Sequence, residues 1–163
     1  MRRYLWVFAL LTLVECSNPV TGSSGGQCAW VYDSRGQPDT ATKLQGSLRN
    51  AGFPGATVTV TDLGESCGNR FARQYSEFRV TLPVPDLADP AQLGSALESA
   101  LDVLGPELGT GSNQAIVTFD AGSKQQTIRF RAGQADSARR HGLRGAALLD
   151  ALSQSPPRQW DIS

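Results

Sequence analysis

The sequence has few of the residues and motifs on which catalytic sites depend. Its 163 residues include one histidine and three cysteines. It has no His-Glu-x-x-His motif, no Gly-x-Ser-x-Gly elbow between a strand and a helix, and no phosphate-binding glycine loop. A zinc protease, a serine hydrolase and a nucleotide-binding enzyme are therefore without support. The sequence indicates no reaction and no cofactor.

The chain also lacks an excess of charge and a membrane-length apolar run. Lys plus Arg number 15 and Asp plus Glu number 15, which gives a formal net charge of zero. No overall electrostatic field therefore attracts nucleic acid, and we predict no nucleic-acid partner. The apolar run from Tyr4 to Val14 is shorter than the roughly 20 residues that cross a bilayer.

This apolar run stands behind two arginines and in front of a cysteine. Arg2 and Arg3 form a positive n-region and Tyr4 to Val14 forms an h-region, which is the anatomy of a secretory leader. We therefore predict that residues 1–15 are a signal peptide and that the rest of the chain is exported.

The end of the leader carries a recognisable motif. Leu13-Val14-Glu15-Cys16-Ser17 resembles the lipobox of bacterial lipoproteins, with Glu15 where that family usually has a small residue. The resemblance implies that Cys16 is acylated, for example with palmitate, and that the lipid holds the protein on the bacterial cell membrane or the outer membrane. Residues 16–27 are rich in Gly and Ser and predict a flexible tether. Plain secretion and a retained N-terminal anchor are the alternatives.

Residues 28–153 are predicted to form a single domain, followed by a polar tail over residues 154–163. The domain is long enough for one hydrophobic core. Loss of residues 1–15 takes away Arg2, Arg3 and Glu15, so that 13 basic and 14 acidic side chains remain, a formal charge of −1. The mature chain would thus keep no charge excess that selects a partner.

The cysteines predict one disulfide. If Cys16 carries lipid, Cys28 and Cys67 form an even set, and an exported domain can keep a disulfide. A bridge across this separation would stabilise the fold by roughly 3–4 kcal/mol. The alternative is a zinc site with His141, but the two cysteines and this histidine lack any recognised ligand spacing.

Turn signals and hydrophobic periodicity predict alternating strands and helices. The strongest local signal is Asp89-Pro90, an N-cap followed by proline at the first helical position. An earlier helix is expected to begin at Asp39 or Thr40. The pattern predicts, in order, a strand over 29–33, a helix ending near 51, a strand over 56–62, a loop over 63–75, a strand over 77–82, a helix ending at 105–106, strands over 115–119 and 126–131 joined by a hairpin turn, and a helix through 146–152.

This order predicts an α+β fold of the ferredoxin-like class. Two split βαβ units would form an antiparallel sheet with helices on one face and the first strand at its centre, and an edge hairpin strand and a C-terminal helix would follow. Cys28 would then begin the first strand while Cys67 follows the far end of the second. Five strand residues span about 16 Å, whereas bridged Cα atoms lie within roughly 7 Å. Either the loop over 63–75 folds back, or the topology or the bridge is wrong.

One face of such a sheet would remain uncovered. The residues expected to face the helices are apolar: Val58, Val60, Phe78, Val80, Ile128 and Phe130. The opposite face would present threonines together with Arg79, Arg129 and Arg131. Trp30 and Tyr32 share one face of the first strand, and on the open face they would complete a candidate binding surface. The alternative is that both aromatic side chains point into the core.

A second group of arginines lies toward the C-terminus. Its members are Arg129, Arg131, Arg139, Arg140 and Arg144. Such a group could hold an anion, such as a phosphate or a carboxylated glycan, or it could be a solvated face. His141 lies between these arginines, and we assign it an exposed or capping role.

We therefore expect a lipid-anchored binding or structural module of the cell envelope, with the open sheet face or an edge strand as its contact surface. Its partner would be an envelope protein, a peptide that adds a strand to the edge, or a glycan. The alternative is a small secreted or surface-attached hydrolase with a site near the loop over 63–75. A cleft that gathers His141 with Asp62, Glu65 or Glu77 would favour the enzyme.

Overall fold

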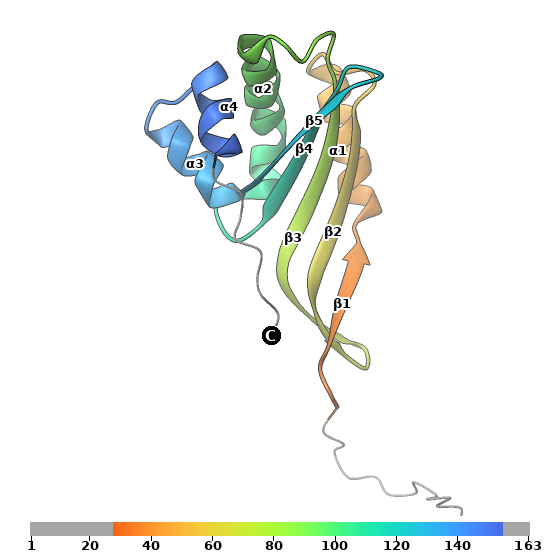
Figure 1. Ribbon diagram of the computed structural model, residues 1–163. Helices are drawn as coiled ribbons and strands as arrows, with labels where there is room; N and C mark the ends of the chain where they lie inside the picture. Colours follow the sequence, from red (N-terminus) through yellow and green to blue (C-terminus); the bar gives the residue numbers. More distant parts are fainter. Residues whose placement is uncertain (1–27, 155–163) are drawn as a thin grey trace, which may run out of the picture.

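The structure, a computed structural model, describes residues 28–154 (Figure 1). The predicted signal peptide, Cys16 and the rest of the tether lie outside the described residues, as does the tail from residue 155. Within the described range, no helix is both long and apolar enough to cross a membrane. The elements are β1 (Val31–Gly36), α1 (Pro38–Asn50), β2 (Thr57–Cys67), β3 (Arg70–Pro83), α2 (Pro90–Leu108), β4 (Gln114–Asp120), β5 (Gln125–Arg131), α3 (Ala132–Arg140) and α4 (Gly145–Ser153).

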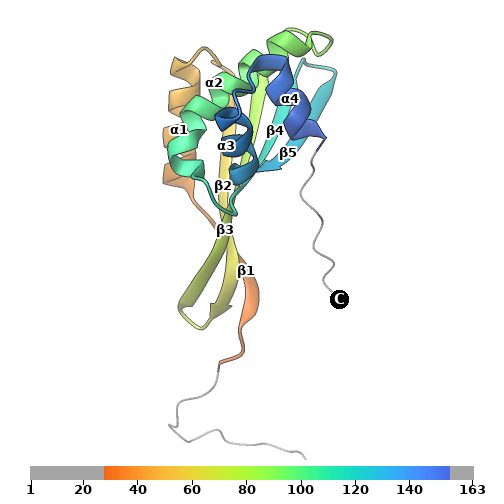
Figure 2. The ribbon, with the colours of Figure 1, turned by 90° about the vertical axis from the view of Figure 1, so that its left-hand side faces the viewer.

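The strands form one sheet, and the helices lie against one face of it. In Figure 2 α2, α3 and α4 stand in front of the strands and α1 lies beside them, and Leu44 and Leu48 of α1 belong to the same hydrophobic core. The other face, called the open face below, carries no helix among residues 28–154. This arrangement confirms the predicted α+β class.

The strands follow one another across the sheet in chain order, β1-β2-β3-β4-β5. β3 and β4 are parallel, because α2 carries the chain back from the end of β3 to the start of β4. The other neighbouring pairs are antiparallel. The ferredoxin-like order is therefore not confirmed, since β1 lies at an edge of the sheet and one strand pair is parallel. The edge hairpin of β4 and β5 is present as predicted.

The segment predicted as a loop over 63–75 is instead the continuation of two strands. β2 runs to Cys67 and β3 begins at Arg70, with Gly68 at φ 59° in the tight turn between them. Figure 2 shows this hairpin extending beyond the helices. Because no helix covers it, its sequence lacks the alternation of apolar and polar residues that marks a half-buried strand. We call β1 together with residues 63–75 the hairpin arm.

Cys28 and Cys67 form a disulfide at the end of the hairpin arm, with their Cα atoms 5.6 Å apart. β1 is antiparallel to β2, and Val31 lies opposite Ser66. The distance conflict expected for a central first strand does not arise, because β1 pairs with the far half of β2. The predicted pairing of the two cysteines is present, while the predicted position of the first strand in the sheet was wrong.

The hydrophobic core lies between the sheet and the helices. All the residues predicted to face the helices are buried: Val58, Val60, Phe78, Val80, Ile128 and Phe130. From α2, Leu93, Leu97, Leu101 and Leu104 are at most 2 % exposed. Burial of each such side chain contributes roughly 1.5–3 kcal/mol. The apolar side of the sheet was thus predicted correctly.

Helix ends follow the local sequence in some places and not in others. Asp89 caps α2 as predicted, because its carboxylate accepts hydrogen bonds from the first backbone N–H groups of the helix. α2 continues through Gly105 to Leu108, which is 2 % exposed, so burial of this leucine outweighs the local stop signal. α1 begins at Pro38 with Gln37 as its N-cap, earlier than expected, because proline suits the first helical position.

Candidate functional site

The open face of the sheet carries polar side chains in rows that cross the strands. One row consists of Thr57, Thr81, Thr118 and Thr127, which the register places side by side. The hydroxyl oxygens of Thr118 and Thr127 lie 3.0 Å apart and share a hydrogen bond. The predicted threonine face of β2 is therefore part of a wider polar surface.

The neighbouring row holds two of the arginines predicted to bind a partner. Its members are Thr59, Arg79, Ile116 and Arg129. The Nε atom of Arg79 donates to Oε1 of Glu77 at 2.7 Å. Ile116, which the register places between Arg79 and Arg129, is only 6 % exposed. The sheet thus brings Arg79 and Arg129 together.

A concavity of about 510 Å³ opens where this face meets the hairpin arm. Its lining residues are Tyr32 from β1, Glu65 from β2, Gln74 and Tyr75 from β3, Gln114 from β4, Arg131 from β5 and Ser112 from the preceding loop. Tyr32 and Arg131 meet here although their strands are at opposite edges of the sheet. Strand twist and a β-bulge between Leu63 and Gly64 bend the arm relative to the rest of the sheet.

Tyr75 lies half-buried in the wall of the concavity. Burial first, and then a side-chain hydrogen bond with Tyr32 and the negative charge of Glu77, raise the pKa of Tyr75 to about 12, while Arg129 acts in the opposite direction. The phenol therefore stays protonated at physiological pH. It can donate and accept hydrogen bonds, but it does not act as a base.

The loop between α2 and β4 holds the concavity in shape. Ser112 Oγ donates to the carbonyl oxygen of Gln74 at 3.3 Å, and the backbone N–H of Ser76 donates to Asn113 Oδ1 at 2.8 Å. Asn113 Nδ2 in turn donates to the carbonyl oxygen of Leu108 at 2.8 Å. These bonds join β3, the loop that precedes β4 and the end of α2, so the lining residues sit on a connected frame.

Asp62 anchors the base of the hairpin arm on the helix side of the sheet. The residue is 9 % exposed. Its carboxylate accepts hydrogen bonds from Gln37 Nε2 at 2.8 Å and from Ser76 Oγ at 2.6 Å. A guanidinium nitrogen of Arg73 lies 3.8 Å from the same carboxylate. The carboxylate therefore ties the start of α1 to β2 and β3.

His141 is not brought to the carboxylates with which it would favour an enzyme. It follows the end of α3, where its Nδ1 lies 2.8 Å from the carbonyl oxygen of Ser137. Asp62 belongs to the buried network on the helix side, and Glu65 lines the concavity. Among residues 28–154 no three His, Cys, Asp or Glu side chains are grouped so as to hold a metal ion.

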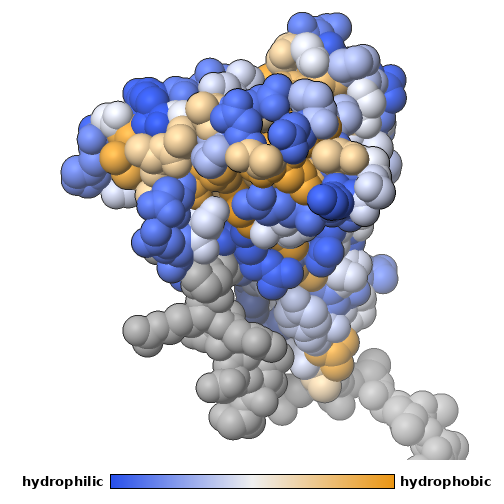
Figure 3. Space-filling view, turned by 45° about the horizontal axis from the view of Figure 1, so that its top comes forward, coloured by the Kyte–Doolittle hydropathy of each residue, from blue (hydrophilic) through white to orange (hydrophobic). Residues whose placement is uncertain are grey.

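The two aromatic residues of the predicted binding surface are exposed. Trp30 is 48 % exposed, Val31 58 % and Tyr32 64 %, so neither Trp30 nor Tyr32 points into the core. Figure 3 shows hydrophobic side chains at the lower end of the described part of the chain and also in a band across its upper part, with hydrophilic side chains around both. These exposed residues lie on or next to β1, which is an edge strand of the hairpin arm. The sequence had predicted a central position for this strand.

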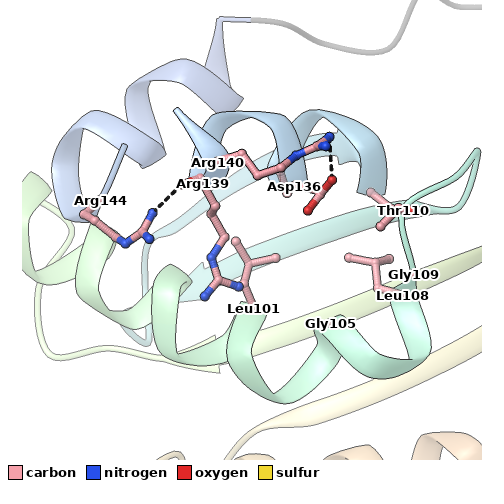
Figure 4. A pocket seen from close by; sticks show the side chains of 11 residues that line it. Leu101, Gly105, Leu108, Gly109, Thr110, Asp136, Arg139, Arg140 and Arg144 are labelled. Atoms are coloured by element: carbon pink, nitrogen blue, oxygen red, sulfur yellow. Dashed lines mark hydrogen bonds and ion pairs between the residues drawn. The ribbon is translucent and has the colours of Figure 1, made fainter. Parts of the chain in front are cut away.

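The C-terminal arginines, predicted as one group, are divided between two sides of the molecule. Arg129 and Arg131 lie on β5, whereas the other three border a cavity of about 370 Å³ in the helical layer (Figure 4). Those three pair as Arg139 with Asp102, Arg140 with Asp136 at 2.8 Å, and Arg144 with Glu98 at 3.1 Å. A carboxylate thus offsets each arginine of the helical cavity.

Four residues of the concavity were not singled out from the sequence: Gln74, Tyr75, Ser112 and Gln114. The first two lie in the segment interpreted as a loop, as does Glu65, which was named only as part of a possible enzyme cleft with His141. Gly68-Asn69 is a dipeptide typical of a two-residue hairpin turn. That signal would have placed Tyr75 and Glu77 on one face of a strand.

Comparisons with protein-family models, with curated proteins and with solved structures found no match for this chain.

Proposed function

We propose that the protein is a lipid-anchored module of the bacterial cell envelope that binds a partner in the concavity of its open sheet face. The supporting observation is that Tyr32, Tyr75 and Arg131, which come from three different strands, line the same concavity. Tyrosine and arginine are the residue types on which interaction surfaces rely most, because each combines a large contact area with polar atoms.

The lining favours a polar ligand that carries both a carboxylate and hydrogen-bonding amide or hydroxyl groups. Arg131 offers charged donors for a carboxylate. Gln74 and Gln114 supply amides that donate and accept, and the neutral phenol of Tyr75 does the same. Glu65 disfavours a ligand that is uniformly anionic. An envelope peptide or glycan has this mixture of groups, and soluble peptidoglycan fragments carry peptide, sugar and carboxylate together.

Replacement of Tyr32 by alanine tests the concavity as a binding site. We expect isothermal titration with soluble peptidoglycan fragments to show binding that Tyr32→Ala weakens at least about fivefold, because a truncated contact residue at the centre of a site costs more than about 1 kcal/mol. Val31→Ala is the matched control, since Val31 is also exposed and adjacent but does not line the concavity. Equal affinities of Tyr32→Ala and the unmodified protein would contradict the proposed site.

Replacement of Cys16 tests the proposed anchor. The lipobox-like Leu13-Val14-Glu15-Cys16 predicts that Cys16→Ala releases the protein from membranes, because the acyl chains are then missing. Membrane fractionation of cells that express each form is the measurement. Intact mass of the membrane-extracted protein reports the acyl chains directly. Retention of the variant in the membrane fraction would argue against acylation.

A further inference from the structure

The outer edge of β1 is open to another strand. β1 is the first strand of the sheet, and among residues 28–154 no strand lies beyond it. All its residues are exposed except the half-buried Asp33. An edge strand of this kind presents a row of backbone N–H and C=O groups to which a further strand can pair.

The hydrogen bonds of β1 show which backbone groups point outward. The N–H of Gln37 donates to the carbonyl oxygen of Val60 at 2.8 Å, so the residues at odd-numbered positions of β1 face β2 with their backbone groups. The backbone groups of Tyr32, Ser34 and Gly36 therefore face away from the sheet. In agreement, the N–H of Ser34 donates to the side chain of Asp33 at 2.8 Å.

The sequence of β1 is complementary to itself when two copies run antiparallel about Ser34. Ser34 then lies opposite Ser34 of the second copy, and Tyr32 lies opposite Gly36, so the outward-facing groups of both strands meet. Asp33 lies opposite Arg35 of the second copy, in the position where cross-strand side chains approach most closely. Two equivalent ion pairs can therefore form across the contact, in place of the 3.8 Å pairing between Arg35 and Asp33 of the same chain.

The glycine opposite Tyr32 supplies the space that the tyrosine ring needs. A Cβ added at Gly36 would meet no atom within 4 Å, and an aromatic side chain packs well over a glycine on a neighbouring strand. A shift that centres the pair on Asp33 would place the two Asp33 carboxylates opposite each other and remove one pair of outward-facing residues from the contact. Charge and the number of hydrogen bonds therefore select the register about Ser34.

We propose that β1 is a homodimer contact, in which a second copy of this chain extends the sheet across a two-fold axis at Ser34. The axis is perpendicular to the sheet, so both open faces lie on the same side of the dimer. This contact needs no ligand, and it shares Tyr32 with the concavity of the binding function proposed above. Its short length predicts a weak, concentration-dependent dimer.

Cross-linking tests the symmetry of the contact. In the full chain with Cys16→Ser, we expect Ser34→Cys to form a disulfide-linked dimer under mild oxidation, because residues opposite each other in a hydrogen-bonded pair have Cα atoms about 5.5 Å apart. Val31→Cys is the control: it is exposed on the same strand, but the two copies of residue 31 would be about 20 Å apart. We expect Ser34→Cys to cross-link at least tenfold faster. Equal rates at the two positions, or a cross-link to another protein in place of a homodimer, would overturn the proposal.

A charge exchange tests the register. We expect Arg35→Asp to abolish the rapid cross-link at Ser34→Cys, because Asp33 would then face a carboxylate. The further change Asp33→Arg should restore it, since the exchanged pair again has opposite charges. Circular dichroism of each variant establishes that the fold is retained. This register would be wrong if the Ser34→Cys cross-linking rate is unchanged by Arg35→Asp. It would also be wrong if the double change Arg35→Asp and Asp33→Arg does not restore that rate.

Discussion

Asp62 and Tyr75 are polar residues that the fold partly buries, and each has its own hydrogen-bond partners. Asp62 faces the helices and accepts hydrogen bonds from Gln37 and Ser76, so its carboxylate has partners for both oxygens. Tyr75 faces the opposite side and shares a hydrogen bond with Tyr32. The first residue fixes the base of the hairpin arm, whereas the second shapes the concavity.

The raised pKa of Tyr75 predicts a loss of stability at alkaline pH. Its pKa is about 12 in the folded protein, above the value of about 10 for an unfolded chain. The stabilising contribution of this phenol is therefore complete below about pH 10 and is lost as the pH rises toward 12. Tyr75→Phe should remove this loss, measured as the free energy of unfolding in urea at a series of alkaline pH values.

Absorbance titration of the phenols provides the control for this prediction. Tyr32→Phe removes a hydrogen bond that raises the pKa of Tyr75, so the ionisation of Tyr75 should move to lower pH in that variant. An ionisation of Tyr75 near pH 10 in the folded protein would contradict the described surroundings.

At the scale of elements, the contact of α2 with α4 depends on a glycine. Gly94 is buried in α2, and a Cβ added there would overlap the backbone of Gly145 at the start of α4. The close approach lets Leu148 and Leu152 of α4, at most 2 % exposed, join the leucines of α2 in the core. The small residue in α2 is therefore a packing requirement.

Replacement of this glycine predicts a clear stability change. Gly94→Ala should lower the free energy of unfolding by roughly 1–3 kcal/mol, because the two helices must separate to admit the methyl group. Gly46→Ala in α1 is the matched control, since a Cβ at Gly46 meets no atom within 4 Å, and alanine is favoured by roughly 0.5–1 kcal/mol over glycine inside a helix. Denaturant unfolding of both variants measures the change in the free energy of unfolding. Equal changes for Gly94→Ala and Gly46→Ala would contradict the close packing of α2 against α4.

At the scale of the whole molecule, the hairpin arm is held by backbone pairing and the disulfide more than by apolar burial. β1 is exposed along almost its whole length, and the bond between Cys28 and Cys67 closes a separation of 39 residues. Closing a loop of that length lowers the entropy of the unfolded chain. The stability of the hairpin arm therefore depends on the disulfide to a greater extent than the stability of the core does.

Removal of the disulfide is expected to lower the stability by roughly 3–4 kcal/mol. The double change Cys28→Ser and Cys67→Ser should also make β1 sensitive to limited proteolysis, while the core sheet stays folded. Urea unfolding and mass analysis of the cleavage products measure the two effects. A count of two free thiols at these positions in the non-reduced mature protein would contradict the bridge.

Local patterns in the sequence predicted the elements whose faces are covered. The alternation through Phe78 and Val80, the cap at Asp89 and the leucine stripe of α2 all reflect contact with a core on one side only. α3 was not expected, because its buried residues are the alanines Ala132 and Ala135, which give a weak stripe. Residues 63–75 of the arm were interpreted as a loop because no helix covers them, whereas a strand was predicted over 29–33.

The face of the strand arginines was predicted from the sequence, whereas the exposure of Trp30 and Tyr32 was one of two alternatives, and the neighbours of these residues were not predicted. Arg79, Arg129 and Arg131 do lie on strands of the sheet, and Trp30 and Tyr32 are exposed. Only the folded chain shows that Tyr32 and Arg131 share a concavity with Tyr75. The positions of these residues in the sequence do not predict that they lie close together, because their proximity depends on the order and twist of five strands.

The amino-acid sequence by itself determined the α+β class, the buried face of each covered strand, the capped start of α2 and the pairing of the two cysteines, because each of these depends on local periodicity or on residue type. The tertiary structure alone decided the place of β1 at the sheet edge, the parallel pairing of β3 with β4 and the convergence of residues in the concavity. These features arise from contacts between segments far apart in the chain, where several strand orders satisfy the same local pattern and only the packing of the whole molecule selects one.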